Sequence, residues 1–319
     1  MEYEKIYNPM ITAFNEDMKY NKLFSYITEL SIISIKSLIP SESLEKVYID
    51  YKRYNEEIKL WRSYRHGDNP SLLNVSNMDY SIYWKEKDDS IYTRILPIIM
   101  VNRDFSNIRD EIIKNVLFTT GNIESLIEAI LIGKLIFLLI EGEVDIIEEL
   151  KDEIIKLSQV NYINEYENYY RFSPNQYGKR FKISFEQKKI FALNILNSSS
   201  AKGFQVLKDS LEVLISEGNG ETTIGKCIKA ILDNKAEENL VSDYYKELIE
   251  YLYRLRKGRI SPEILKIEKY YLPDIFQFNE GDEFYHSLLN RCKVIKREDN
   301  ENNVVIYLNT KSGMYRFIQ

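Results

Sequence analysis

Apolar residues recur every three or four positions along most of the chain, a pattern typical of helices that bury one face. The first such stretch covers residues 21–39 and stops at Pro40. Ser41 and Ser43 then supply side-chain oxygens that can cap a second helix, which we expect to end near Trp61. Further helices are predicted at residues 91–101, 108–118, 123–141, 144–157, 184–196, 204–216, 223–232 and 240–255, with another start at 261–263.

The stretch 123–141 differs from the others because apolar residues occupy nearly all of its faces. A helix of this kind belongs at the centre of a domain. Its longest apolar run, 126–140, contains Glu128 and Lys134 and is shorter than a helix that spans a bilayer. We therefore expect a core helix and a protein without membrane contact.

The period changes near the end of the chain. After Cys292 apolar residues alternate in short runs, separated by turn-forming residues at 299–303 and 309–313. This pattern predicts a small antiparallel β meander. We expect an all-α fold in which residues 1–290 form a multi-helix bundle and residues 291–319 form a β appendage. If the chain is an interaction module, we expect the unpaired outer strand of the meander to be its docking edge.

Composition and charge narrow the classes of function. The 319 residues carry a formal net charge of −6, which argues against a general nucleic-acid surface because such surfaces need clustered positive charge. The two cysteines, Cys227 and Cys292, lie far apart, and neither has a histidine or cysteine at zinc-ligand spacing. Isolated thiols and the absence of a secretion signal predict a cytoplasmic protein. We expect His66 and His286 to be surface residues.

Polar segments next to the predicted helices carry the candidate chemistry. The first is Asn15-Glu16-Asp17-Met18, and the last is Gly218-Asn219-Gly220-Glu221-Thr222, directly ahead of residue 223. Between them lie 60–72, the stretch 88–97 with Arg94 and Pro97, and the related stretch 119–124. In this order, over residues 12–232, the segments resemble motifs of the ADP-ribosylglycohydrolase family. The resemblance implies a multi-helix orthogonal bundle of ADP-ribosylglycohydrolase type.

Members of that family are expected to use two magnesium or manganese ions to bind ADP-ribose and to help water cleave its bond to a protein side chain. The resemblance places Asp17 at the catalytic position. It also implies two sets of binding residues, the metal ligands Glu16, Asp17, Glu221 and Thr222, and the ligand-contacting residues Gly218, Asn219, Gly220 and Arg94.

The chain departs from the family pattern at the metal ligands. Glu16, Asp17 and Glu221 are the acids that remain where the family has four aspartates, and a second alignment register places Gly220 and Thr222 at two of those positions. Hard cations need several oxygen ligands in a fixed arrangement, so we expect a weakened or lost metal site. The glycine-rich opening helix of the family is expected to be missing.

Each candidate residue also has a local structural interpretation. Glu16 and Asp17 stand ahead of a predicted helix, where acids favour the positive end of the helix dipole. The Gly-Asn-Gly sequence at 218–220 can be a turn followed by threonine capping of the next helix. Arg94 can form a structural ion pair as readily as a phosphate contact.

Three functions remain open at this point. The first is a catalytically impaired relative that binds a macromolecular partner or an ADP-ribose-like ligand, with no metal if it is inactive. The second is an active magnesium- or manganese-dependent hydrolase that removes ADP-ribose from modified protein. The third is a helical protein–protein interaction module.

Overall fold

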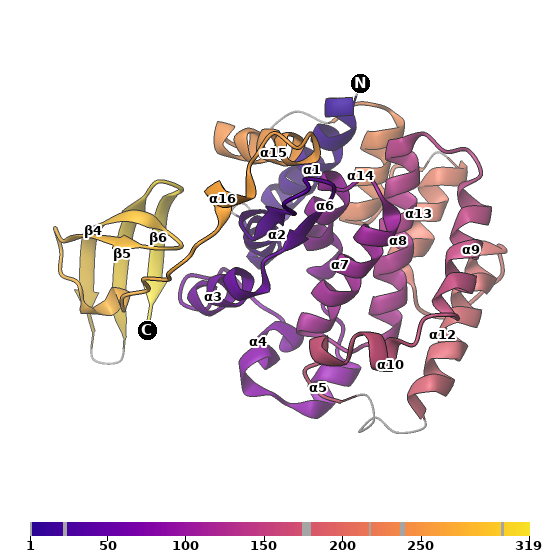
Figure 1. Cartoon of the computed structure of the whole chain (residues 1–319), viewed down its shortest axis with the longest axis horizontal. Coiled ribbons are helices and arrows are strands. Elements are labelled where there is room, and N and C mark those ends of the chain that lie inside the picture. Colours follow the sequence, from indigo (N-terminus) through magenta and orange to yellow (C-terminus); the bar gives the residue numbers. More distant parts are fainter. Residues whose placement is uncertain (1, 22–23, 174–179, 217, 237–239, 301–302) are drawn as a thin grey trace.

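The computed structural model describes residues 2–21, 24–173, 180–216, 218–236, 240–300 and 303–319. It shows a mainly helical body followed by a small antiparallel sheet (Figure 1). The longer helices are α1 (Glu2–Asn21), α2 (Tyr26–Lys36), α3 (Tyr51–Trp61), α4 (Pro70–Asn77), α5 (Tyr80–Lys85), α6 (Ile91–Val101), α7 (Phe105–Thr119), α8 (Ile123–Glu141), α9 (Ile146–Leu157), α12 (Arg180–Leu196), α13 (Gln205–Ser216), α14 (Thr223–Leu232) and α15 (Asp243–Arg256). Single turns are α10 (Tyr162–Glu165), η1 (Glu167–Tyr169), α16 (Pro262–Leu265) and η2 (Ile275–Gln277).

The helices α6 and α8 form the centre of the body, a position that the apolar sequence of residues 123–141 predicted for α8. Every residue of α8 except Phe137 and Glu141 is buried. The helix packs against α6, α7, α9, α12 and α13, so its apolar faces all have neighbours. Asn122 caps its start by accepting a hydrogen bond from the Ser125 backbone N–H, and Gly142 ends it in the left-handed conformation. Among the described residues, no helix combines the length and apolar character needed to cross a bilayer.

The N-terminal region differs from the prediction because a long helix precedes α2. Ile6, Met10 and Phe14 recur at four-residue spacing in α1 and are at most 1% exposed, where α1 packs on α14 and α15. Pro9 interrupts the helical signal, since a proline cannot donate the hydrogen bond of an interior position, yet it lies inside α1. Residues 16 and 17 therefore lie in the last two turns of a helix, and their expected place ahead of one is wrong.

The predicted helix start at Ser41 is also wrong. Residues before α3 form a two-stranded hairpin of β1 (Leu38–Pro40) and β2 (Val47–Ile49), and α3 is capped by Asp50. The side chain of Asn102 holds this hairpin by hydrogen bonding to both the N–H and the C=O of Val47, each at 2.9 Å. A distant residue thus stabilises a strand pair too short to be recognised from its own sequence.

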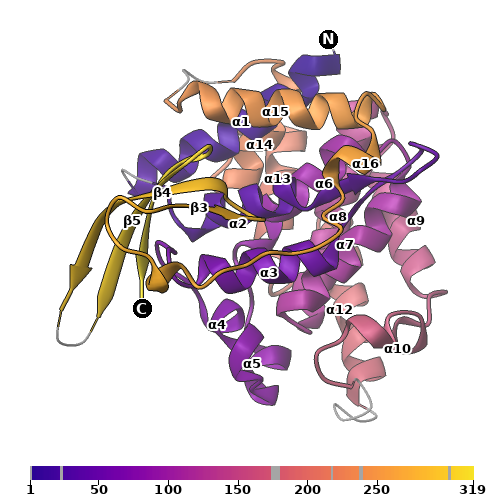
Figure 2. The same cartoon turned by 60° about the vertical axis from the view of Figure 1, so that its left-hand side comes forward.

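The C-terminal sheet has the strand order β3-β4-β5-β6, formed by β3 (Glu283–His286), β4 (Asn290–Asp299), β5 (Val304–Thr310) and β6 (Gly313–Ile318). All neighbours are antiparallel, which confirms the predicted meander, although the sheet begins at β3 and so before residue 291. The sheet lies at one side of the body (Figures 1 and 2) and contacts it where Ser63 accepts a hydrogen bond from the Ile318 N–H at 2.7 Å.

One histidine of this sheet corrects a prediction. His286 is buried, at 3% exposure, and its Nδ1 accepts a hydrogen bond from the Leu288 N–H at 3.2 Å. Burial, with a smaller contribution from the charge of Lys36, lowers the pKa of His286 to about 4. His66, in contrast, has a side chain that is 60% exposed and lies 2.6 Å from Glu29. Both cysteines are buried free thiols.

Candidate functional site

The helices α1 and α14 bring together the first and last polar segments of the sequence. They pack side by side (Figure 1), and between them lies a cleft of about 930 Å³. Glu16 from α1 and Asn219 and Gly220 from the loop before α14 all line this space, which we call the α1–α14 cleft. Two stretches more than 200 residues apart therefore share one cavity. The charged residues among those described that line it are Glu16, Lys19, Lys226, Lys229, Asp233 and Lys235.

The carboxylate of Glu16 is held by two of these lysines. Lys226, in the first turn of α14, hydrogen bonds to Oε2, and Lys19 lies 3.1 Å from Oε1. The side chain of Glu16 is only 2% exposed, whereas that of Lys226 is 27% exposed toward the cleft. Burial opposes the charge on Lys226, but the hydrogen bond and charge of Glu16 outweigh it and raise its pKa. An ammonium group thus provides the cation beside this acid.

The loop before α14 has a fixed backbone. Asp209 of α13 accepts hydrogen bonds from the backbone N–H groups of Glu221, at 2.8 Å, and Thr222, at 2.9 Å. Thr222 also donates its hydroxyl to Asp209 and accepts from the Gly225 N–H at 3.0 Å, which caps α14. Gly220 has φ +78°, and a Cβ there would lie 2.6 Å from the Gly225 carbonyl carbon. Only glycine fits this position, because both the backbone angle and the space exclude a side chain.

One wall of the α1–α14 cleft contains an unsatisfied polar group. Thr12 lies one turn before Glu16 on α1 and lines the cleft, yet it is only 6% exposed. Its Oγ1 has no hydrogen-bond partner within the described part of the chain. Buried hydroxyls usually have a partner, but this oxygen is itself shielded from solvent and is therefore not presented to the cleft.

The other predicted metal ligands point elsewhere. Asp17 is 6% exposed and tethers the start of α2: its Oδ2 accepts from the Ser25 N–H at 2.9 Å, and its Oδ1 accepts from the Ser25 hydroxyl at 2.6 Å. Asn21 donates a further hydrogen bond to Asp17 at 2.7 Å. Glu221 is exposed, and neither Asp17 nor Glu221 is among the residues that line the cleft.

This arrangement does not fit a pair of hard cations. Such ions need several oxygen ligands that converge, and here Glu16 is engaged by lysines while the Thr222 hydroxyl is engaged by Asp209. Within the described ranges, no group of three or more histidine, cysteine, aspartate or glutamate side chains is placed to hold a metal ion. We therefore derive no chemical step through a metal at this site.

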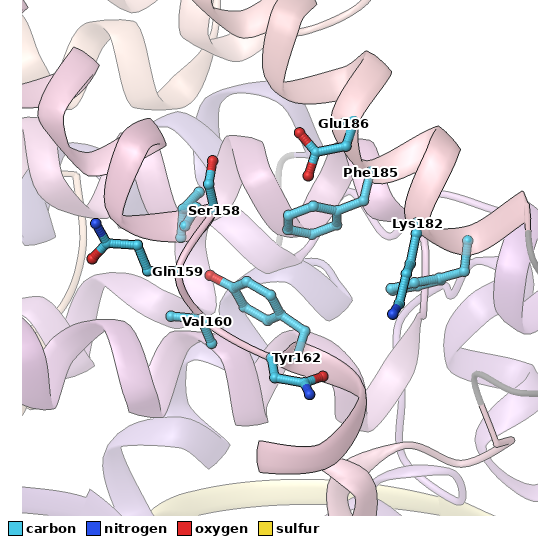
Figure 3. Close-up of a pocket in the computed structure, with 10 residues that line it drawn as sticks. Ser158, Gln159, Val160, Tyr162, Lys182, Phe185 and Glu186 are labelled. Carbon is cyan, nitrogen blue, oxygen red and sulfur yellow. The ribbon is translucent and has the colours of Figure 1, made fainter.

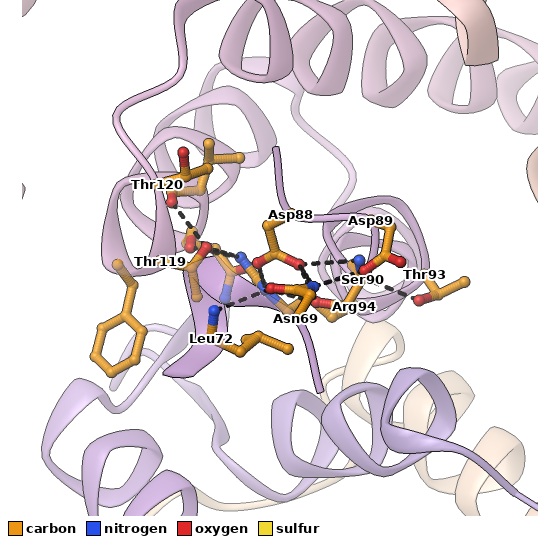
Figure 4. Close-up of polar contacts among 12 residues, drawn as sticks. Asn69, Leu72, Asp88, Asp89, Ser90, Thr93, Arg94, Thr119 and Thr120 are labelled. Atoms are coloured by element: carbon orange, nitrogen blue, oxygen red, sulfur yellow. Dashed lines mark hydrogen bonds and ion pairs between the residues drawn. The ribbon is translucent and has the colours of Figure 1, made fainter. Parts of the chain in front are cut away.

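Arg94 lies in a separate, fully buried cluster (Figure 4). Its guanidinium pairs with Asp88 and donates to the Ser90 hydroxyl at 2.9 Å. It also reaches α7, where it donates to the Asn115 side chain at 2.7 Å and to the Thr119 hydroxyl at 2.8 Å. We call this cluster the Asp88–Arg94 centre. It joins the loop before α6 to the end of α7, and Arg94 does not line the α1–α14 cleft.

The charges of the Asp88–Arg94 centre stabilise each other. Both side chains are 0% exposed. Burial alone would raise the pKa of Asp88, but the charge of Arg94 and the hydrogen bonds around the carboxylate lower it below its ordinary value. Burial likewise opposes the charge on Arg94, and Asp88 raises its pKa overall. The predicted structural role of this arginine as a buried ion-pair partner agrees with these contacts.

A smaller cavity of about 290 Å³ lies between the end of α9 and α12 (Figure 3). The ring of Tyr162 contacts that of Phe185 with centroids 4.9 Å apart, and Ser158 lies on the neighbouring wall. Lys182 and Glu186 are the charged residues among the described ones that line it. None of the residues that the sequence singled out lies here.

Lys226 and Asp209 are functional candidates that the sequence alone did not reveal. Each carries a local signal. A lysine in the first turn of a helix opposes the helix dipole, which indicates an acidic partner outside the helix. Asp209 lies on the buried face of α13, where a carboxylate needs hydrogen-bond donors.

Comparison of the sequence with models of known protein families gives no match, and comparison with curated proteins gives none either.

Proposed function

We propose that this protein is a catalytically impaired relative of the ADP-ribosylglycohydrolases that binds an ADP-ribose-like ligand, free or attached to a protein, in the α1–α14 cleft. The observation that supports this proposal is the meeting of Glu16 with Asn219 and Gly220 in one cavity, because these residues belong to the two most distant segments of the resemblance. Each segment alone has a local explanation, and the packing of α1 on α14 places both beside the same cavity, as a shared ligand site requires.

The charge of the cleft fits a pyrophosphate. Four lysines and two acids are the charged groups among the described residues that line it, so positive charge remains in excess although Glu16 pairs with Lys19 and Lys226 and Asp233 pairs with Lys229. Lysine ammonium groups bind phosphate oxygens as point charges. The N-terminal turn of α14 adds the positive end of a helix dipole next to the loop at 218–222. A volume of about 930 Å³ accommodates a ligand of nucleotide size.

The positions of the carboxylates favour binding over hydrolysis. A general base must reach the water that it activates, and the oxygens of Asp17 accept hydrogen bonds from Ser25 and Asn21 instead. The competing proposal, an active hydrolase dependent on magnesium or manganese, requires these oxygens to turn toward the cleft. The binding protein and the hydrolase therefore differ in the expected effect of metal ions and of Asp17 substitution.

Thermal unfolding distinguishes the proposed binding protein from the metal-dependent hydrolase. ADP-ribose should raise the unfolding midpoint because a ligand that binds only the folded state stabilises it, and magnesium or manganese chloride alone should leave the midpoint unchanged. A rise with millimolar metal alone would contradict the proposal. No rise with ADP-ribose at concentrations up to several millimolar would also contradict it.

Turnover is tested with an arginine- or serine-ADP-ribosylated protein as substrate. We expect the wild type and Asp17→Ala to release no ADP-ribose above the rate without protein, with or without manganese. Release by the wild type that Asp17→Ala abolishes would establish the hydrolase instead. Equal release by both would remove Asp17 from any mechanism.

A further inference from the structure

A third cavity, of about 560 Å³, lies between the C-terminal sheet and the helical body. Its walls are β6 on one side and the helices α2 and α15 on the other. We call it the β6 groove. None of the residues that line it lines the α1–α14 cleft, so the two sites can be tested separately.

One edge of the sheet opens into this groove. The strand order places β6 at an edge, and residues 313–316 line the groove. Val304 and Gln319 exchange two backbone hydrogen bonds, at 3.3 and 3.0 Å, so the N–H and C=O groups of Gln319 point toward β5. Because the bonding direction alternates in an antiparallel pair, Met314, Arg316 and Ile318 turn their N–H and C=O groups away from β5.

The outward groups of β6 are only partly satisfied. Ile318 donates its N–H to the Ser63 carbonyl at 2.7 Å. In the described part of the chain, the backbone groups of Met314 and Arg316 on this edge have no such partner. Met314 is 70% exposed, so the edge is accessible. Unpaired edge groups of this kind are the template on which an extended peptide adds to a sheet.

The opposite wall is aromatic and held in place. Phe24 contacts Tyr245 with ring centroids 4.4 Å apart, and Tyr245 contacts Tyr244 at 5.3 Å. Tyr64 packs on Tyr315 of β6 at 5.0 Å and closes the base of the groove. Tyrosine rings provide contact area with little loss of conformational entropy, as recognition surfaces require.

The charge of the groove selects the partner. Lys36, Lys311, Arg316 and His66 line it, with Glu29 as the one carboxylate among the described lining residues. Lys36 already pairs with Glu57 at 2.8 Å, so Lys311 and Arg316 provide the positive charge for a partner. That carboxylate is already engaged, since it accepts from the Trp61 indole at 2.8 Å and lies 2.6 Å from His66 Nδ1. A peptide that carries acidic side chains complements this surface.

We propose that an extended acidic segment of a partner protein binds in the β6 groove as a fifth strand. Its backbone pairs with the outward groups of Met314 and Arg316, and its acidic side chains lie near Lys311 and Arg316. Its remaining side chains pack on the tyrosines of α15.

An array of random eight-residue synthetic peptides tests this docking site with the full chain. The wild type should select peptides rich in aspartate, glutamate and β-branched residues. Met314→Pro removes an outward N–H without touching the β5 ladder, and we expect it to weaken the selected peptides about three- to tenfold. Met314→Ala keeps the N–H and serves as the matched control. The double variant Lys311→Glu with Arg316→Glu should abolish the preference for acidic peptides.

Three results would overturn the docking site: no peptide selected by the wild type, selection of basic peptides, or equal binding by Met314→Pro and Met314→Ala. Circular dichroism and thermal unfolding establish that each variant is folded. ADP-ribose binding should be unchanged in all of them, so the outcome is independent of the function proposed for the α1–α14 cleft.

Discussion

The α1–α14 cleft and the Asp88–Arg94 centre both contain residues that the sequence singled out, but they use their charges differently. In the Asp88–Arg94 centre both partners are 0% exposed, and Arg94 has protein acceptors on α7 as well as on its own loop. In the cleft, Glu16 is buried while Lys226 is 27% exposed toward a cavity.

We therefore assign the charges of the Asp88–Arg94 centre to fold stability and those of the α1–α14 cleft to ligand recognition. A charge whose partners are all internal contributes to stability, and its loss leaves an uncompensated buried group. A charge that faces a cavity contributes little to stability and remains available to a ligand. The following changes test this division.

The largest effect is expected for Arg94→Met. This change leaves the Asp88 carboxylate buried without its cation, and we expect a loss of about 3–5 kcal/mol in the free energy of unfolding. Urea denaturation measures it. Arg291→Met, which breaks a pair with Glu283 whose side chains are 83% and 41% exposed, is the control and should cost less. A loss for Arg94→Met below that of the control would contradict the assigned role.

A smaller loss is expected for Gly220→Ala. The positive φ costs roughly 1–2 kcal/mol, and the new Cβ collides with the start of α14, so the loop moves. Gly142→Ala is the matched control, because Gly142 has φ +84° but only the Lys5 Nζ within 4 Å, at 3.8 Å. Both should lose stability in denaturation experiments, whereas only Gly220→Ala should also lose ADP-ribose binding. Unchanged binding would remove the loop from the site.

Glu16→Gln separates binding from metal chemistry. The amide keeps an oxygen for Lys226 but removes a negative charge from the cleft, so ADP-ribose should bind about three- to tenfold more tightly. Fluorescence titration with a labelled ADP-ribose measures the change, with Glu148→Gln on α9 as the control. A metal-dependent site predicts the opposite, since it would lose a ligand oxygen. Weaker binding by Glu16→Gln would therefore favour the hydrolase.

The smallest effect concerns pH. The folded-state pKa of Lys226 is raised, so its pairing stabilises the protein below the ordinary lysine pKa of 10.5 and this stability is lost as pH rises through the folded value. The Asp88 pKa is lowered, so its contribution to folding stability is present above pH 3.8, the ordinary aspartate pKa. This contribution is lost as the pH falls through the pKa of the folded state. Between pH 9 and 11.5, unfolding free energies should decline less steeply for Lys226→Met than for the wild type. Parallel slopes would contradict this assignment.

The sequence predicted those elements whose signal is local. The bounds of α6, α8 and α14 follow from apolar periodicity together with neighbouring cap residues such as Asn122 and Thr222. The helix α1 and the hairpin before α3 escaped prediction because Pro9 interrupts one pattern and the distant Asn102 stabilises the other.

The same distinction applies to the candidate site. The resemblance predicted that residues near 16 and 219 would face each other, and they line one cleft. It did not predict that Lys226 would pair with Glu16 across 210 positions, or that Asp17 would turn toward Ser25. Residues 16 and 17 both lie inside α1, where neighbouring side chains point about 100° apart, so they cannot both face α14.

Isothermal titration of ADP-ribose into the protein, with EDTA present, tests the central claim most directly. We predict saturable binding by the wild type that added magnesium does not strengthen. Lys226→Met should weaken it about tenfold, and Lys151→Met, which removes a lysine paired with Glu148 on α9, should leave it unchanged. Binding that appears only with magnesium, or that both variants weaken equally, would contradict the account.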